Sequence, residues 1–245
     1  MLTPSGHHLT RLAEYIGHAI VTGEYVGGNT PTETEISKRF GTSRSVTREA
    51  LKMLTAKGLI SSRPRHGTVV APQAEWNLLD PDVLRWLLER KFSLRLLAEF
   101  TEVRLGIEPV AAALAARNAD EAGLEEILEG LRRMKNAANG ENNALSADIA
   151  FHVAILNATK NPFYRELHEL VNTALHISFR FTNRIKGHTA SIRSHEEVAT
   201  AIIDRDADKA ANAMRALILD VLEMIRAATP PCELGIGQPD QKGDT

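Results

Sequence analysis

The chain has 245 residues, of which 43% are hydrophobic and 24% charged, an ordinary composition for a globular protein. No apolar run approaches the roughly 20 residues that a membrane span requires, so we expect a soluble protein without a membrane partner. The N-terminus has neither a basic leader nor a continuous apolar stretch, which predicts no signal peptide and a cytoplasmic location. The single cysteine, Cys232, excludes an intramolecular disulfide.

Charge is distributed unevenly along the chain. Residues 1–73 contain nine Lys and Arg and five Asp and Glu, a net charge of +4, whereas the remainder has a net charge of −6. A length of 245 residues allows two domains, and this asymmetry indicates that only the first one meets a polyanion.

Two helices are predicted in residues 9–41. Thr32 and Glu35 have the S/T-x-x-E spacing of a capping box, and Gly41 is suited to end the second helix. The apolar residues of the first helix that share one face are Leu12, Ile16, Ala19 and Ile20.

A third helix is predicted after a tight turn, with Ser43 as its N-cap and Gly58 at its end. We expect its inward face to hold Val46, Ala50 and Met53. Its outward face is expected to hold Arg44, Arg48 and Lys52. Two short β-branched runs then flank an Arg-Pro-Arg-His-Gly turn, which is typical of a two-stranded wing. This order of elements predicts a winged helix-turn-helix, whose third helix enters the DNA major groove.

Arg44 and Arg48 are the leading candidates for reading bases. An arginine near the start of a recognition helix can pair with guanine O6 and N7, which gives about 1–3 kcal/mol of discrimination. Arg65 and His66, at the tip of the hairpin, are placed to reach the DNA backbone or minor groove. The alternative is a solvated basic face on a structural helix, but the order of the surrounding elements favours DNA.

Residues 29–71, NTPTETEISKRFGTSRSVTREALKMLTAKGLISSRPRHGTVVA, resemble the DNA-binding domain of GntR-type bacterial transcription regulators. Thr34, where many members have arginine, and Thr47, where proline is common, depart from the family pattern and leave the operator sequence open. With the contacts that the resemblance implies, the residues predicted to lie at the DNA are Thr32, Glu33, Ser43, Arg44, Ser45, Thr47, Arg48, Arg65, His66 and Gly67.

From Pro81 onward the chain has helical spacing almost throughout, and neither a GxGxxG nor a P-loop pattern is present. Helices are predicted to start at Ser93, Asp120, Asn161 and Asp206. Gly140 is predicted to end a helix. We therefore expect a mainly α protein with four parts: a winged helix-turn-helix at 1–73, a linker at 74–80, an all-α bundle of about seven helices at 81–229, and a disordered tail at 230–245.

Asp148 and His152 lie one helical turn apart on a face that is expected to be buried. Burying a carboxylate without a partner costs several kcal/mol, so Asp148 needs one. A divalent metal ion would serve, and the spacing of His195 from Val198 and Ile202 turns it inward as a third ligand. A hydrogen-bonded core pair without a metal stays equally open.

Arg104 shares a helical stripe with Leu97, Phe100 and Ala111, so its guanidinium is expected to face the core. A buried guanidinium needs an anion. Two are open: the carboxylate of Glu108, one turn later, and the carboxylate of a small ligand held by the planar fork of the arginine.

Residues 80–228 resemble the FCD effector domain of the FadR subfamily, through EVRLGIEPVAAALAA, Asp148-x-x-x-His152, Asn161-Pro162 and His195. The resemblance implies that Asp148, His152 and His195 bind a divalent metal and that Arg104 helps to hold a carboxylate effector. Metal-binding members usually supply another histidine from the last helix, where this chain has Leu217. Either metal binding is lost, or water and effector oxygens fill the open positions.

The segment AEWNLLDPDVLRWLLE resembles the branch of this subfamily that contains the galactonate-operon repressor, which favours a sugar acid as effector. Zinc suits the expected ligands, with nickel or manganese as alternatives. We expect a homodimer on an inverted-repeat operator that represses a sugar-acid catabolic operon.

Two other functions stay open: a metal-dependent hydrolase fused to a DNA-binding domain, and an architectural DNA-binding protein with a structural metal. Further candidates for the cavity are His168, His176, Thr182 and Asn183.

Overall fold

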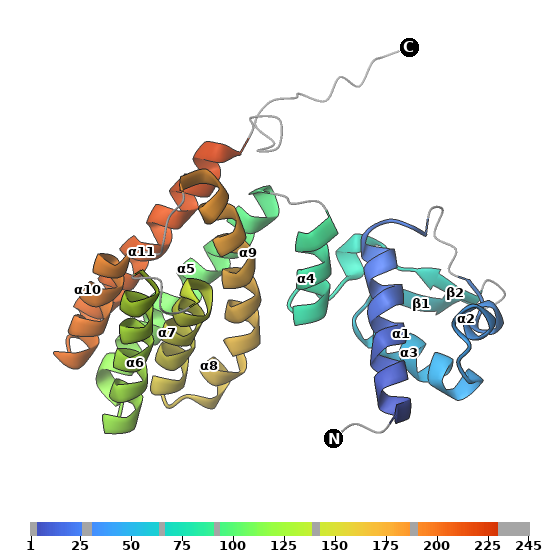
Figure 1. The fold of residues 1–245 in the computed structure, drawn as a ribbon, viewed down its shortest axis with the longest axis horizontal. Helices are drawn as coiled ribbons and strands as arrows, with labels where there is room; N and C mark the ends of the chain where they lie inside the picture. The colour runs from blue at the N-terminus through green and yellow to red at the C-terminus, as the bar shows by residue number, and fades with distance from the viewer. Residues whose placement is uncertain are drawn as a thin grey trace, which may run out of the picture. The chain divides into compact units, whose positions relative to one another are not determined.

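The computed structural model describes residues 4–25, 31–63, 67–90, 94–138, 143–186 and 191–229 (Figure 1). The chain divides into two compact units, Met1–Phe92 and Ser93–Thr245. Within the described residues, no helix is long and apolar enough to cross a membrane. The predicted tail at 230–245 and the predictions for Ser93 and Gly140 fall outside these residues.

The first unit is a winged helix-turn-helix, as the sequence predicted. Its strands pair antiparallel, with Ile60 opposite Val70. The elements in chain order are α1 (Pro4–Val21), α2 (Glu33–Phe40), α3 (Arg44–Ala56), β1 (Ile60–Arg63), β2 (Gly67–Val70), the 3₁₀ turn η1 (Gln73–Glu75) and α4 (Pro81–Arg90).

The helix starts in this unit follow from the capping residues. The Thr32 hydroxyl accepts a hydrogen bond from the Glu35 amide, and the Glu35 carboxylate accepts one from the Thr32 amide at 2.7 Å. Gly41 ends α2 in the left-handed region with φ of 62°, where glycine pays no steric cost. Ser43 caps α3 by accepting a hydrogen bond from the amide of Val46. The predicted capping box and both of the predicted caps are confirmed.

The buried face of α3 differs from the predicted one. Met53 is 36% exposed and Val46 is half-buried, so of the predicted stripe only Ala50 lies in the core. The buried residues of α3 are Thr47, Ala50, Leu51 and Leu54. The polar Thr47 concealed this face in the sequence, because its hydroxyl can be buried only with partners in place.

Helix α4 belongs to the first unit. The Trp86 indole NH donates to Glu14 at 2.8 Å, and Arg85 contacts the same carboxylate at 2.8 Å. A Cβ atom on Gly17 would lie 2.4 Å from the Trp86 ring, so the indole packs directly on the backbone of α1. The predicted domain boundary before residue 81 is therefore corrected to one after α4, and segment 74–80 connects elements of the same unit.

Lys57 fixes the segment that leads into α4. Its Nζ atom lies 2.8 Å from Asp80 and 2.9 Å from Asp82. Partial burial alone would raise the pKa of Asp82, but hydrogen bonds and charge from Lys57 and Arg85 lower it. Partial burial alone would lower the pKa of Lys57, but the two aspartates raise it.

The second unit is the predicted all-α domain (Figure 1). Its N-caps at Asp120, Asn161 and Asp206 accept hydrogen bonds from the amides of Gly123, Phe163 and Lys209, as predicted. Within the described residues its helices are α5 (Leu94–Asn118), α6 (Glu121–Ala138), α7 (Ala144–Ala158), α8 (Pro162–Glu166), α9 (His168–Lys186), α10 (Ile192–Ile203) and α11 (Ala207–Ala228).

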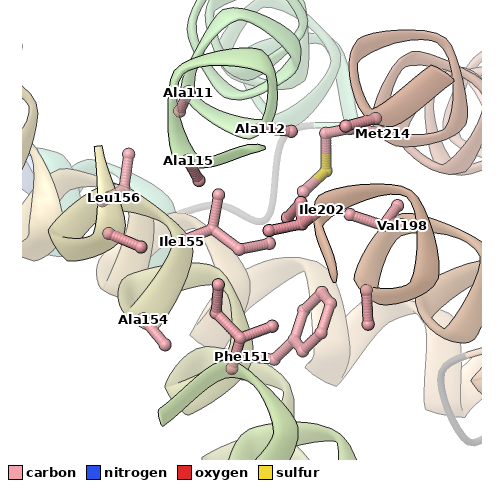
Figure 2. Packing of buried hydrophobic residues seen from close by; sticks show 14 of the residues in the cluster. Ala111, Ala112, Ala115, Phe151, Ala154, Ile155, Leu156, Val198, Ile202 and Met214 are labelled. Carbon is pink, nitrogen blue, oxygen red and sulfur yellow. The ribbon is translucent and has the colours of Figure 1, made fainter. Parts of the chain in front are cut away.

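The core of this unit brings α5, α7, α10 and α11 together (Figure 2). Ile155 of α7 and Ile202 of α10 point toward one another, with Met214 of α11 beside them. A Cβ atom on Gly130 would lie 2.8 Å from the backbone of Phe151, so α6 is in close contact with α7. Close packing of this kind holds the backbone of α7 in one position.

Candidate functional site

The exposed polar side chains at the start of α3, together with Glu33 of α2, form a surface that we call the α3 surface. Arg44, Ser45 and Arg48 are exposed on it, and the Ser45 hydroxyl lies 2.9 Å from that of the N-cap Ser43. Arg48 forms an ion pair of 3.1 Å with Glu33. The predicted outward direction of both arginines is therefore confirmed.

Thr47 does not belong to this surface. It is fully buried, and its hydroxyl lies 2.8 Å from that of Ser37 and 2.9 Å from that of Thr42. The prediction that Thr47 contacts DNA is corrected on this ground: its hydroxyl ties α2 and the turn to α3.

Two other predicted DNA contacts lie on short structural features. The hydroxyl of Thr32 is engaged in capping α2. Gly67 opens β2 with φ of 71°, in exposed surroundings with open space at its Cβ position. Arg65 and His66, just before it, lie outside the described residues.

A second set of polar side chains lies in the interior of the second unit. Each is at most 7% exposed, which is uncommon for ionisable groups unless they are paired or hold a metal. This buried polar cluster consists of Arg104 and Glu108 of α5, Asp148 and His152 of α7, and His195 of α10. The predicted inward direction of Arg104, Asp148, His152 and His195 is confirmed.

Arg104 and Glu108 form an internal ion pair. The Arg104 Nε atom lies 2.6 Å from Glu108 Oε1, and Nη2 lies 3.4 Å from Oε2. Burial alone would raise the pKa of Glu108, but the charge of Arg104, together with His152, lowers it to about 2. Of the two anions left open for Arg104, Glu108 is the one that it contacts here.

The partners of the two histidines determine where their ring protons lie. His152 Nδ1 is 2.5 Å from the Glu108 carboxylate, and His195 Nδ1 is 2.8 Å from the carbonyl oxygen of Ser191. Because the carbonyl can only accept, and the ionised carboxylate does the same, we infer that each Nδ1 carries hydrogen. In the neutral rings, each Nε2 atom therefore has a free lone pair.

These lone pairs meet at Asp148. The Oδ1 atom of Asp148 lies 3.1 Å from His195 Nε2 and 3.7 Å from His152 Nε2. The shorter separation lacks hydrogen-bond geometry, so Asp148 Oδ1 and His195 Nε2 are buried with no hydrogen-bond partner among the residues that the structure describes. The longer one exceeds a hydrogen bond, which argues against a simple Asp148–His152 core pair.

The cluster fits a divalent cation. One ligand atom from each of Asp148, His152 and His195 lies within 4.8 Å of the others. Buried acceptor atoms that face one another repel unless a proton or a cation lies between them, and a carboxylate with two imidazoles is a common donor set for transition metals. The Glu108 carboxylate contacts His152 Nδ1, the ring nitrogen on the side away from Asp148, as carboxylates that orient metal-bound histidines do.

Among the described residues, the group that could hold a metal does not include His168 or His176. Leu217 is buried in the hydrophobic core. His176 is exposed, and His168 is half-buried with its Nδ1 atom 2.7 Å from the carbonyl oxygen of Arg165. The side chains of Thr182 and Asn183 lie outside the described residues.

Helical spacing predicted Glu108 only as a partner of Arg104. Its contact with His152 joins residues 44 positions apart, on α5 and α7. Nothing in the local spacing of either helix could have indicated this contact.

Comparison with known proteins bears on both units. Residues 9–70 match the family described as "Bacterial regulatory proteins, gntR family", and residues 99–220 match the FCD domain. The "Galactonate operon transcriptional repressor" of Escherichia coli (strain K12) is 33% identical over 223 residues, which cover 89% of this chain and 97% of that protein. The "Uxu operon regulator" of Haemophilus influenzae is 30% identical over 220 residues, or 84% and 77% of the two chains.

Solved structures agree on the fold. A structure described as Lar, which controls expression of the Listeria monocytogenes agr system, has a TM-score of 0.59 at 16% identity and covers 93% of this chain and 99% of that one. E. coli McbR/YncC has a TM-score of 0.51 at 16% identity, with the same two coverages.

The winged helix-turn-helix and the matching domains define a DNA-binding transcription regulator rather than an enzyme. The similarity to the galactonate operon repressor extends over nearly the whole of both chains. The chain therefore belongs to the bacterial gntR family, with an FCD domain as its second part.

Proposed function

We propose that this protein is a repressor that binds its operator as a homodimer and responds to a sugar acid held in a metal-containing cavity. The observation that carries the proposal is a pair of buried atoms, Asp148 Oδ1 and His195 Nε2, that have no hydrogen-bond partner within the described part of the chain. The cluster that contains them also holds the buried Arg104. A cation satisfies these two atoms, and an arginine nearby suits a carboxylate ligand.

The metal would be held by Asp148, His152 and His195. One carboxylate and two imidazoles suit zinc best, with nickel or manganese as alternatives. When bound, the ion supplies positive charge and open coordination positions for oxygen atoms of a ligand. Leu217 offers no donor atom, so three protein ligands leave room for the effector.

The effector would be anchored by Arg104, whose planar guanidinium matches a carboxylate. A sugar acid is the favoured class because a 33% identical relative is named as the galactonate operon transcriptional repressor. Sugar acids combine a carboxylate with hydroxyl groups, so they suit both Arg104 and a metal with open positions. The FCD domain supports assigning the protein to the FadR subfamily as part of this proposal.

The DNA side of the proposal rests on the α3 surface. Arg44 and Arg48 are exposed one helical turn apart, where each can reach the edge of a guanine. Two copies related by a twofold axis would place two such helices on an inverted repeat. An effector that binds one arrangement of the dimer better by 1–3 kcal/mol changes operator affinity by roughly 5- to 150-fold.

The test is a thermal-shift series with D-galactonate and other sugar acids, before and after metal removal by a chelator. Neutral D-galactose serves as the matched control, because it retains hydroxyl groups but lacks the carboxylate. We expect selective stabilisation by an acid that disappears after chelation and returns with Zn²⁺. Stabilisation that survives chelation would remove the metal from the proposal, and equal shifts with galactose would remove Arg104 as the carboxylate anchor.

A further inference from the structure

We infer that Glu108 is a positioning residue that connects the anchor of the effector, Arg104, to the metal ligand His152. The inference has two halves. Glu108 orients His152 for a metal, and it couples the affinity for metal to the affinity for a carboxylate. The second half rests on the proposed function, whereas the first does not.

Glu108 divides its two carboxylate oxygens between the two neighbours. Oε1 accepts from Arg104 Nε at 2.6 Å, while Oε2 accepts from His152 Nδ1 at 2.5 Å and lies 3.4 Å from Arg104 Nη2. The residue is 2% exposed and Arg104 is 3% exposed, so bulk water offers little replacement for either contact. A change in the hydrogen bond at one oxygen must therefore alter the strength of the hydrogen bond at the other.

The contact with His152 gives this carboxylate a role beyond neutralising Arg104. By accepting a hydrogen bond from His152 Nδ1, Glu108 holds the Nε2 lone pair toward Asp148 and His195. A partner of this type fixes the tautomer and ring orientation of a metal-binding histidine and raises its basicity. Charge neutralisation of Arg104 alone would not require a contact with His152.

The contact with Arg104 provides the coupling. A ligand carboxylate that pairs with Arg104 competes with Glu108 Oε1 for the guanidinium. Glu108 then accepts more strongly from His152, which strengthens Nε2 as a metal donor. Ligand and metal should therefore raise the affinity for each other by the same factor, because linkage is reciprocal.

The first half is tested with Zn²⁺ alone, by competition with a chromogenic chelator. In Glu108→Gln the single amide oxygen accepts from the buried Arg104, so the amide NH₂ group faces His152 Nδ1 and cannot accept its hydrogen bond. We therefore expect about a 10- to 100-fold loss of Zn²⁺ affinity. Glu102→Gln is the matched control on the same helix. Glu102 is half-exposed and forms an ion pair with Arg226 at 2.6 Å, and this change should leave Zn²⁺ affinity unaltered.

A charge-balanced pair of variants covers the case in which Glu108→Gln fails to fold. Arg104→Met combined with Glu108→Gln keeps an acceptor for His152 Nδ1, whereas Arg104→Met combined with Glu108→Leu does not. Neither carries an unpaired charge at these two positions. We expect Zn²⁺ affinity near that of the native protein in the first and about 10- to 100-fold lower in the second. Equal affinities in the two would overturn the positioning role.

The second half is tested by titrating Zn²⁺ with and without D-galactonate. In the native protein we expect a saturating acid to raise Zn²⁺ affinity. In Glu108→Gln we expect a smaller ratio, because direct contact between acid and metal remains while the route through Glu108 is lost. A ratio unchanged in Glu108→Gln would show that direct contact between acid and metal carries all of the coupling, and would overturn the coupling role of Glu108. If no sugar acid binds the native protein, the effector proposal fails, while the Zn²⁺ comparison still decides the positioning role.

Discussion

Two arginine–glutamate pairs in this molecule have the same chemistry and opposite surroundings. Arg48 and Glu33, on the α3 surface, are 63% and 32% exposed, whereas Arg104 and Glu108 are 3% and 2% exposed. Water can replace either partner of the first pair, so Arg48 can leave Glu33 for DNA at little cost. The second pair is held in place because separating two buried charges is expensive.

The comparison supports the two proposed roles, DNA contact for Arg48 and ligand binding for Arg104. An exposed, solvated guanidinium adapts to the base edge that it meets. A buried one is already oriented and desolvated, so only an anion of suitable size and charge can compete for it. Surroundings, rather than residue type, separate the two proposed roles.

The largest expected effect comes from breaking the buried pair. Arg104→Met should lower the free energy of unfolding by about 3–5 kcal/mol, because it leaves Glu108 charged and buried. Arg48→Ala should cost no more than about 1 kcal/mol. Urea denaturation of the metal-free proteins measures both, and similar losses in the two variants would remove the contrast between the pairs.

Next in size is the loss of a metal ligand. His152→Ala removes one of the three converging donor atoms, so its Zn²⁺ affinity should fall by more than about 100-fold, beyond the usual effect of losing a residue that only orients a metal ligand. Operator binding by the protein without effector should be unaffected. Mobility-shift titrations and metal analysis check the two halves, and a variant that retains Zn²⁺ would place the metal elsewhere.

Changes on the α3 surface should affect operator binding and leave Zn²⁺ binding intact. Arg44→Ala and Arg48→Ala should each weaken operator binding by about 1–3 kcal/mol, while folding and Zn²⁺ content stay the same. Fluorescence anisotropy with operator DNA is the measurement. The buried Thr47 offers a control: Thr47→Ser keeps the hydroxyl and should change affinity less than either arginine variant. Unchanged operator affinity in both arginine variants would remove them from the interface.

The smallest effect concerns pH and the contacts of Lys57. The pKa of Asp82 is lowered in the folded protein, so its stabilising contribution is present above the unfolded pKa of about 3.9 and is lost as the pH falls further. Because Asp82 is partly exposed, Asp82→Asn should cost less than about 1 kcal/mol at pH 7. Melting curves should converge for the two proteins under acidic conditions, and a constant difference would argue against this ion pair.

Local spacing predicted much of both sites. The capping residues Thr32 and Ser43 fix where α2 and α3 start, and the periodicity around Arg104 and His152 shows which side chains turn inward. These features depend on residues within one or two helical turns of each other, so the sequence alone carries them.

What escaped prediction depends on contacts between distant segments. Glu108 meets His152 across 44 positions, and Trp86 meets Glu14 across 72. The buried hydroxyl of Thr47 is paired with Ser37 and Thr42, so a residue that looks polar in the sequence lies in the core. Periodicity cannot report such pairings, because it describes one helix at a time.

The packing of Trp86 on Gly17 has a consequence for the design of hybrid regulators. A DNA-binding part cut before α4 would lose the indole that covers α1, together with its hydrogen bond to Glu14. It would expose an apolar surface on α1 that favours aggregation. A regulator assembled from the first unit of this chain and the sensing domain of a relative should therefore keep α4 and be joined at residues 91–93, so that each half brings its own complete core.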